Sequence, residues 1–262
     1  MSAAEGAIPS PSGLLDAKLI LGVFVTFCRI GACLMLTPGV SSPQIPVQVR
    51  LFVALGATLS LAPLVLDAAA LHALRDDPLS ILQLIARESL TGALIGLLAR
   101  LFFLALETLA FAMAIMLGFS NPFGVSVEPD QAMPPLASMI ALSATALVFF
   151  SDLHWEVLRG LAASYHVVPI GSPFNPQYAL RHVADILGES FRIALRVSSP
   201  FFIYAVIVNL AMSVINRLTP QVAVFYMATP FIIAGGLMLL YFTIKPLLGE
   251  FLAGFEAWLV SG

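Results

Sequence analysis

Long apolar runs fill most of this chain, and ionic or amide side chains stand inside several of them. Arg29, Arg100, Glu107 and Asn209 are the clearest cases. A charged side chain that faces hydrocarbon costs about 2.5–3.5 kcal/mol on insertion scales. The runs therefore predict a membrane protein whose helices do not face lipid on every side.

The composition agrees with that interpretation. Of the 262 residues, 60% are hydrophobic and only 10% are charged, whereas an ordinary globular domain is roughly half apolar and a quarter charged. The net charge of −3, without a cluster of Lys or Arg, argues against binding to nucleic acid. Cys28 and Cys33 form no CxxC pair and are interpreted as packing residues.

We predict an all-α, polytopic integral membrane protein made of helical hairpins, because a helix needs about 20 apolar residues to cross a bilayer. The apolar runs cover residues 14–36, 49–71, 79–119, 136–150 and 222–244, with a weak amphipathic tail at 247–260. They group into hairpin segments at about 14–71, 79–150 and 179–244, all in one helical membrane domain of residues 14–262. We expect residues 1–13 to form a flexible N-terminal segment.

The run at 79–119 holds no proline although it is about twice as long as a membrane span needs to be. We therefore expect a long helix that tilts, protrudes or bends near Gly92, Gly96 or Gly118.

A charged stripe lies at the start of the last hairpin segment. Its members recur at helical spacing along one face: Arg181, Asp185, Glu189, Arg192 and Arg196. The same helix is expected to continue through Pro200 to about residue 215. The stripe is either a solvated face or a face toward a neighbouring subunit or a wet channel.

Motifs of catalysis are missing from the sequence. It has no HExxH, Walker, GxSxG or GxGxxG pattern, and no two of its four histidines share a metal-ligand spacing. Asp152 and Glu156 are followed by Arg159, which favours the solvated start of a helix over a pair of catalytic carboxylates. We predict that the chain is not an enzyme and has no metal, no cofactor and no small-molecule substrate.

Small residues at helix-packing spacing are well represented. Gly92 and Gly96 form one small-xxx-small pair, and Gly56 and Ser60 form another. Such spacing lets helix backbones approach closely in a membrane. The partner helix is either part of this chain or part of another subunit.

The segment 118–135 reads GFSNPFGVSVEPDQAMPP. Glycine and proline exclude regular structure there, yet the segment carries apolar side chains that a solvated loop does not need. Irregular backbone at membrane depth is tolerated only when it is buried in protein or lines a cavity. The segment is interpreted either as a plug that closes a pore by packing and dewetting or as an exterior turn.

Residues along most of the chain resemble a known family. The matching positions are Arg29-Ile30-Gly31, Leu34 to Leu36, Pro38, Pro46, Val49-Arg50-Leu51, Pro63, Glu88, Gly92, Gly96-Leu97, Arg100-Leu101, Phe103, Asn209-Leu210, Arg217, Pro220-Gln221, Val224-Phe225 and Pro230. Together they resemble the FliR family of flagellar export-gate proteins, from about Leu15 to Phe242.

The resemblance implies a fold, a function and partners. FliR-like proteins adopt the FliPQR-type export-gate fold, with long bent helices, and assemble with FliP-like and FliQ-like subunits into a pore for unfolded flagellar proteins. An FlhB-like protein wraps the base of this pore. The implied location is the bacterial inner membrane, within the basal body of the flagellum.

The resemblance also implies roles for particular residues. The pore plug would include Phe119, Asn121, Pro122, Phe123, Val125 and Met133. Subunit contacts or buried polar contacts would involve Arg29, Arg50, Glu88, Arg100, Glu107, Asn209, Arg217 and Gln221.

Three alternatives stay open. An injectisome export-gate subunit of the SctT type shares the same pattern. A small-solute transporter would show related halves and an intramembrane coupling residue, and an intramembrane enzyme would show titratable groups that converge at one depth.

Overall fold

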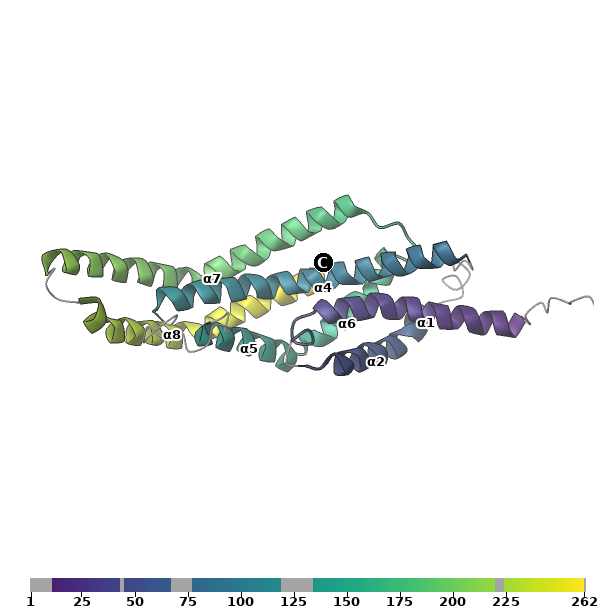
Figure 1. The fold of residues 1–262 in the computed structure, drawn as a ribbon, viewed down its shortest axis with the longest axis horizontal. Coiled ribbons are helices and arrows are strands. Elements are labelled where there is room, and N and C mark those ends of the chain that lie inside the picture. Colours follow the sequence, from purple (N-terminus) through teal and green to yellow (C-terminus); the bar gives the residue numbers. More distant parts are fainter. Residues whose placement is uncertain (1–10, 43–44, 67–76, 119–133, 220–223, 262) are drawn as a thin grey trace, which may run out of the picture. The chain divides into compact units, whose positions relative to one another are not determined.

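The described part of the chain is helical and contains no strand. A computed structural model of the protein describes residues 11–42, 45–66, 77–118, 134–219 and 224–261. Its helices are α1 (Pro11–Leu36), α2 (Val47–Val65), α4 (Pro78–Met116), α5 (Pro135–Phe150), α6 (Leu153–Val167), α7 (Pro176–Leu218) and α8 (Val224–Ser261) (Figure 1). The predicted all-α fold is confirmed for these residues.

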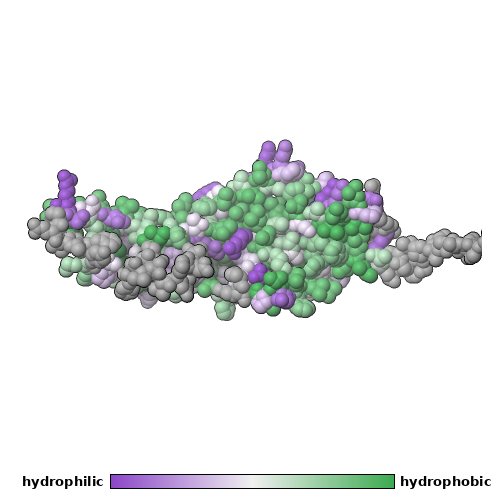
Figure 2. Space-filling model, in the orientation of Figure 1, coloured by the Kyte–Doolittle hydropathy of each residue, from purple (hydrophilic) through white to green (hydrophobic). Residues whose placement is uncertain are grey.

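The helices are long and apolar enough for a polytopic membrane protein. Five of them qualify as membrane spans by length and composition, and a sixth candidate arises if α5 and α6 are one broken span. Helix α4 has 39 residues and α7 has 43, and at 1.5 Å per residue each is about twice as long as a bilayer core of roughly 30 Å is thick. Apolar side chains cover much of the face seen in Figure 2.

The ends of the helices match the predicted runs in most places. Helix α4 is unbroken at Gly92 and Gly96 and ends just before Gly118, whose φ of 80° is the left-handed conformation that commonly terminates a helix. Helix α7 runs through Pro200 as expected. Helix α6 has Glu156 in its first turn, so the predicted helix start near Asp152 is confirmed.

The prediction of a tail at 247–260 that is distinct from the run at 222–244 is wrong. Helix α8 continues from Val224 to Ser261 with both Pro230 and Pro246 inside it. A proline removes one backbone hydrogen bond, but membrane helices tolerate this loss when neighbouring groups compensate for it. Phe251 and Phe255 are buried beyond the second proline, so packing in this part of the helix offsets the missing bond.

The contacts divide the chain into two compact units. Unit 1 contains residues 1–97 and 157–179, and unit 2 contains residues 98–156 and 180–262. Helices α4, α6 and α7 each contribute to both units. The predicted single domain over residues 14–262 stays a prediction.

Unit 1 is built on the pairing of α1 with α2. Its core includes Ile30, Cys33 and Leu34 of α1, Ala54 of α2 and Leu161 of α6. Helix α4 approaches α1 closely at its two glycines. A Cβ atom on Gly92 would overlap the backbone of Arg29, and one on Gly96 would lie 2.9 Å from Cβ of Leu36.

Unit 2 is built around the second half of α4. Phe102 and Phe103 of α4 pack edge-to-face on Phe255 of α8, with ring centroids 5.7 and 5.8 Å apart. On α7, Ala194 packs with Ala105 and Leu109 of α4. Aromatic contacts of this kind add to the burial of apolar area, and they attach the C-terminal part of α8 to α4.

Candidate functional site

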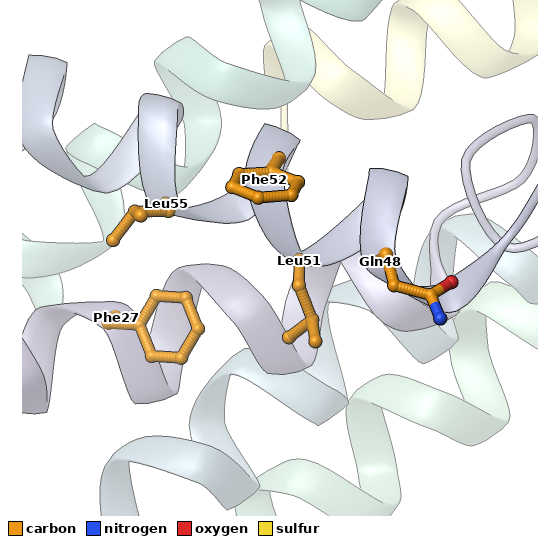
Figure 3. Close-up of a pocket in the computed structure, with 5 residues that line it drawn as sticks. All are labelled: Phe27, Gln48, Leu51, Phe52 and Leu55. Carbon is orange, nitrogen blue, oxygen red and sulfur yellow. The ribbon is translucent and has the colours of Figure 1, made fainter.

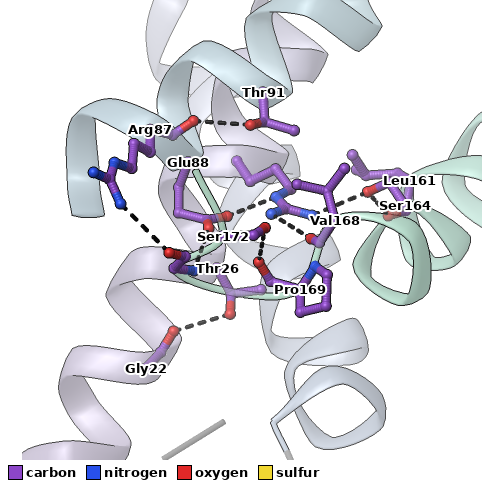
Figure 4. A network of polar contacts seen from close by, with 12 residues as sticks. Gly22, Thr26, Arg87, Glu88, Thr91, Leu161, Ser164, Val168, Pro169 and Ser172 are labelled. Carbon is purple, nitrogen blue, oxygen red and sulfur yellow. Dashed lines mark hydrogen bonds and ion pairs between the residues drawn. The ribbon is translucent and has the colours of Figure 1, made fainter. Parts of the chain in front are cut away.

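The most unusual side chain in the described part of unit 1 is a fully buried arginine. Arg29 of α1 has no exposed surface, and Glu88 of α4 is 2% exposed. Nε of Arg29 donates to Oε2 of Glu88 over 2.6 Å (Figure 4). Because two charges buried in an apolar core are costly unless they pair, this contact is what allows both residues to stand in apolar helices.

The rest of the guanidinium group also has partners. Nη2 of Arg29 donates to the carbonyl oxygen of Val168 over 2.9 Å, and Nη1 donates to Oγ of Ser164 over 3.3 Å. The guanidinium carbon lies 4.0 Å from the centre of the Tyr165 ring, within the range of a cation–π contact. A buried arginine is stabilised when its fork of donors is satisfied in this way.

Glu88 extends the contacts to the connection between α6 and α7. Its Oε1 accepts a hydrogen bond of 3.3 Å from the backbone N–H of Gly171, whose φ is 83°. The neighbouring Arg87 donates to the carbonyl oxygen of Gly171 over 3.4 Å. We call these contacts the Arg29 cluster, made of Arg29, Arg87, Glu88, Ser164, Tyr165, Val168 and Gly171.

The Arg29 cluster is equipped to hold helices together. Arg29 and Glu88 bond to each other, and both also bond to backbone groups of the α6–α7 connection. The cluster joins α1, α4, α6 and the start of the α6–α7 connection, all within unit 1. The sequence singled out Arg29 as a charge in an apolar run, and the family resemblance added Glu88. It carried no signal for Ser164, Val168 or Gly171, which lie far away along the chain.

Arg50 has a different local task. Its Nε donates to the carbonyl oxygen of Ile45 over 3.0 Å, and its Nη2 donates to that of Ser42 over 2.6 Å. These bonds tie the first turn of α2 to the connection that precedes it.

Of the remaining predicted residues, four lie in unit 2. Arg100 and Glu107 approach each other to 3.7 Å along one face of α4 and are partly exposed. Asn209 of α7 donates to the carbonyl oxygen of Ala205 in its own helix over 2.8 Å. Arg217 is exposed near the end of α7. All four belong to unit 2, whereas the Arg29 cluster belongs to unit 1.

Seven predicted residues lie outside the part of the chain that the structure describes. They are Gln221 and the six plug residues Phe119, Asn121, Pro122, Phe123, Val125 and Met133. Their roles stay predictions.

A shallow apolar groove in unit 1 did not emerge from the sequence. It has a volume of about 330 Å³ and is lined by Phe27 of α1 and by Gln48, Leu51, Phe52 and Leu55 of α2 (Figure 3). The four α2 residues are spaced as one helical face, which the sequence does show. That Phe27 completes the groove depends on how α1 and α2 pair, which the sequence does not show.

Large apolar surfaces remain uncovered in unit 2. Helices α7 and α8 expose many large side chains beyond Pro200 and before Lys245, including Ile203, Val206, Leu210, Phe231 and Met238. In the most apolar window of each helix only 17% of the residues are buried. A surface of this size requires lipid or another protein as cover.

The small-residue pairs have unlike surroundings. Gly92 and Gly96 pack against α1 of the same chain. This confirms the interpretation in which the partner helix is part of this chain. A Cβ atom on Gly56 would meet nothing within 4 Å, so the pair of Gly56 and Ser60 on α2 is open.

Comparison with known proteins gives consistent matches. The family model described as bacterial export proteins, family 1, matches residues 20–258. A flagellar biosynthetic protein FliR from Caulobacter vibrioides is 29% identical over 223 residues, which are 82% of this chain and 85% of that protein. FliR of Aquifex aeolicus is 29% identical over 85% of each chain, and FliR of Escherichia coli is 26% identical over 87% of this chain and 85% of its own.

Proposed function

Since the chain belongs to family 1 of the bacterial export proteins, we propose that it is a structural subunit of the flagellar protein export gate. In this proposal it forms, with FliP-like and FliQ-like subunits, the entry pore through which unfolded flagellar proteins are secreted. An FlhB-like protein is a further partner. The observation that carries the proposal is the family match over residues 20–258, together with relatives named as flagellar biosynthetic proteins.

The described residues support a structural role over a catalytic one. The buried ion pair of Arg29 and Glu88 makes hydrogen bonds that hold helices together. Both charged groups of this pair are engaged in hydrogen bonds, so neither is available as a general acid or base. The exposed apolar surfaces of α7 and α8 supply the area that neighbouring subunits of a gate would cover.

We place the protein in the bacterial inner membrane, as a multi-pass component of the flagellar basal body. Five helices of sufficient length and apolar composition support the multi-pass part of this proposal. Its test is fractionation of the cell envelope, in which the chain should follow an inner-membrane marker and also copurify with basal bodies.

Deletion of the gene tests the function. Because every exported flagellar protein would pass this gate, the deletion strain should lack filaments, secrete no flagellin and fail to swim. Expression of the wild-type chain in that strain is the control and should restore all three. Intact filaments in the deletion strain would contradict the proposal.

We further propose that residues 119–133 plug the closed pore, on the basis of their apolar but irregular sequence. Shortening this segment should raise ion leakage through the assembled gate while export continues. The matched control shortens residues 67–76, whose sequence has fewer large apolar side chains, and should leave conductance unchanged. Equal conductance in the two shortened variants would contradict the plug and favour the alternative, in which residues 119–133 form an exterior turn.

A further inference from the structure

Helix α8 has a weak segment between residues 230 and 236. Pro230 has no N–H group, so it cannot donate to the carbonyl group four residues earlier, and Gly235 and Gly236 have low helix propensity. Sharp bends in helices occur at proline and at glycine pairs. Within the described part of α8, this segment combines both causes of bending, whereas Pro246 has no adjacent glycine pair.

Tyr204 of α7 contacts this weak segment directly. Its hydroxyl group donates a hydrogen bond of 2.8 Å to the carbonyl oxygen of Ile232, which lies between the proline and the glycines. A Cβ atom on Gly235 would lie 2.5 Å from the Tyr204 hydroxyl oxygen. The absence of a side chain at Gly235 is therefore what lets the hydroxyl group reach the helix backbone.

The next residue, Gly236, lies against the side chain of Leu117, the residue that follows the end of α4. A Cβ atom there would lie 2.8 Å from Cδ2 of Leu117, so Leu117 packs against the bare backbone of α8. Beyond the glycines, Phe251 and Phe255 anchor the rest of α8 on Phe103 of α4. The weak segment thus separates a firmly packed part of α8 from the part that precedes residue 230.

We propose that the Tyr204–Ile232 hydrogen bond is a latch on a hinge in α8. When the bond is made, residues 230–236 are held against α7. When it breaks, the part of α8 before the glycines bends while the part after them stays on α4. The inference goes beyond the proposed function, because it concerns the motion of one helix and requires no partner subunit.

Hydrogen–deuterium exchange of the full-length chain in lipid nanodiscs tests the latch. Tyr204→Phe keeps the ring but removes the donor, and a single hydrogen bond of ordinary strength predicts about two- to tenfold faster exchange at residues 231–238. Exchange at residues 247–258 should not change. Tyr241→Phe is the matched control, because Tyr241 is 78% exposed on the same helix, and it should leave both segments unchanged.

A second variant separates a hinge from a general loss of packing. Pro230→Ala restores the missing donor and should suppress most of the acceleration that Tyr204→Phe causes. Unchanged exchange at residues 231–238 in Tyr204→Phe would overturn the proposal. So would equal acceleration at residues 247–258, or an acceleration that Pro230→Ala leaves at full size.

Discussion

At the scale of single residues, the Arg29 cluster shows how a charge can reside in an apolar helix. Arg29 loses all contact with water, and its compensation comes from one carboxylate, one hydroxyl group, one carbonyl group and one ring. Removal of one member of a buried ion pair leaves the other charge without compensation, which costs more than removal of both. The pair therefore contributes more to specifying how α1 meets α4 than to net stability.

Glu88→Gln should lower the free energy of unfolding by about 3–5 kcal/mol, because Arg29 would remain charged and buried beside a neutral amide. Thermal unfolding in detergent, followed by circular dichroism, measures the effect. The double variant Arg29→Met with Glu88→Leu should cost less than the sum of the two single variants.

The control for this prediction is an exposed pair. Arg192 and Glu189 approach to 3.0 Å, but their side chains are 76% and 45% exposed. Glu189→Gln should therefore change stability by no more than about 1 kcal/mol. Equal losses for Glu88→Gln and Glu189→Gln would contradict the importance of burial.

The two small-residue pairs support a second prediction at this scale. Gly92→Ala forces a methyl group into the backbone of Arg29, and overpacking of this kind typically costs about 1–3 kcal/mol. Gly56→Ala meets open space and should stabilise α2 by roughly 0.5–1 kcal/mol through its higher helix propensity. Melting temperatures of the two variants should move in opposite directions, and a shared direction would argue against the close approach of α4 to α1.

At the scale of elements, composition and hydropathy were sufficient to predict most helices but not how they pair. The runs at 14–36 and 79–119 became α1 and α4 with small changes at the ends. The predicted end of the last apolar run fell short of the end of α8, because local sequence shows the missing N–H group of Pro246 but not the packing of Phe255 that offsets it. Likewise, Gly92 and Gly56 stand in similar motifs, and only the tertiary structure distinguishes the packed one from the open one.

The turn between α5 and α6 gives a prediction at this scale. Asp152 has a φ of 57°, a conformation in which a Cβ atom costs about 1–2 kcal/mol and which Asp and Asn tolerate better than most residues. Asp152→Gly should keep or raise the melting temperature, and Asp152→Val should lower it. If the valine variant is as stable as the glycine variant, the turn does not adopt this conformation.

At the scale of the whole molecule, the distribution of charge along α7 separates two kinds of surface. Residues 181–196 carry a charged stripe, whereas no charge occurs between Arg196 and Arg217. The uncharged part exposes Ile203, Val206 and Leu210. An apolar surface without charge fits either lipid or a neighbouring subunit, and the export-gate proposal requires that subunits cover at least part of it.

Leu210→Gln distinguishes the two covers. Leu210 is 67% exposed, and exposed substitutions usually change stability by no more than about 0.5 kcal/mol, so the isolated chain should unfold at its normal temperature. If neighbouring subunits cover this surface, copurification with the FliP-like and FliQ-like proteins should fall several-fold. Leu180→Gln, at a site that is 74% exposed beside the charged stripe, is the matched control and should assemble normally. If lipid covers the surface instead, Leu210→Gln should reduce the amount of chain in the membrane fraction, because polar groups are costly in hydrocarbon, while the chains that do insert should still assemble.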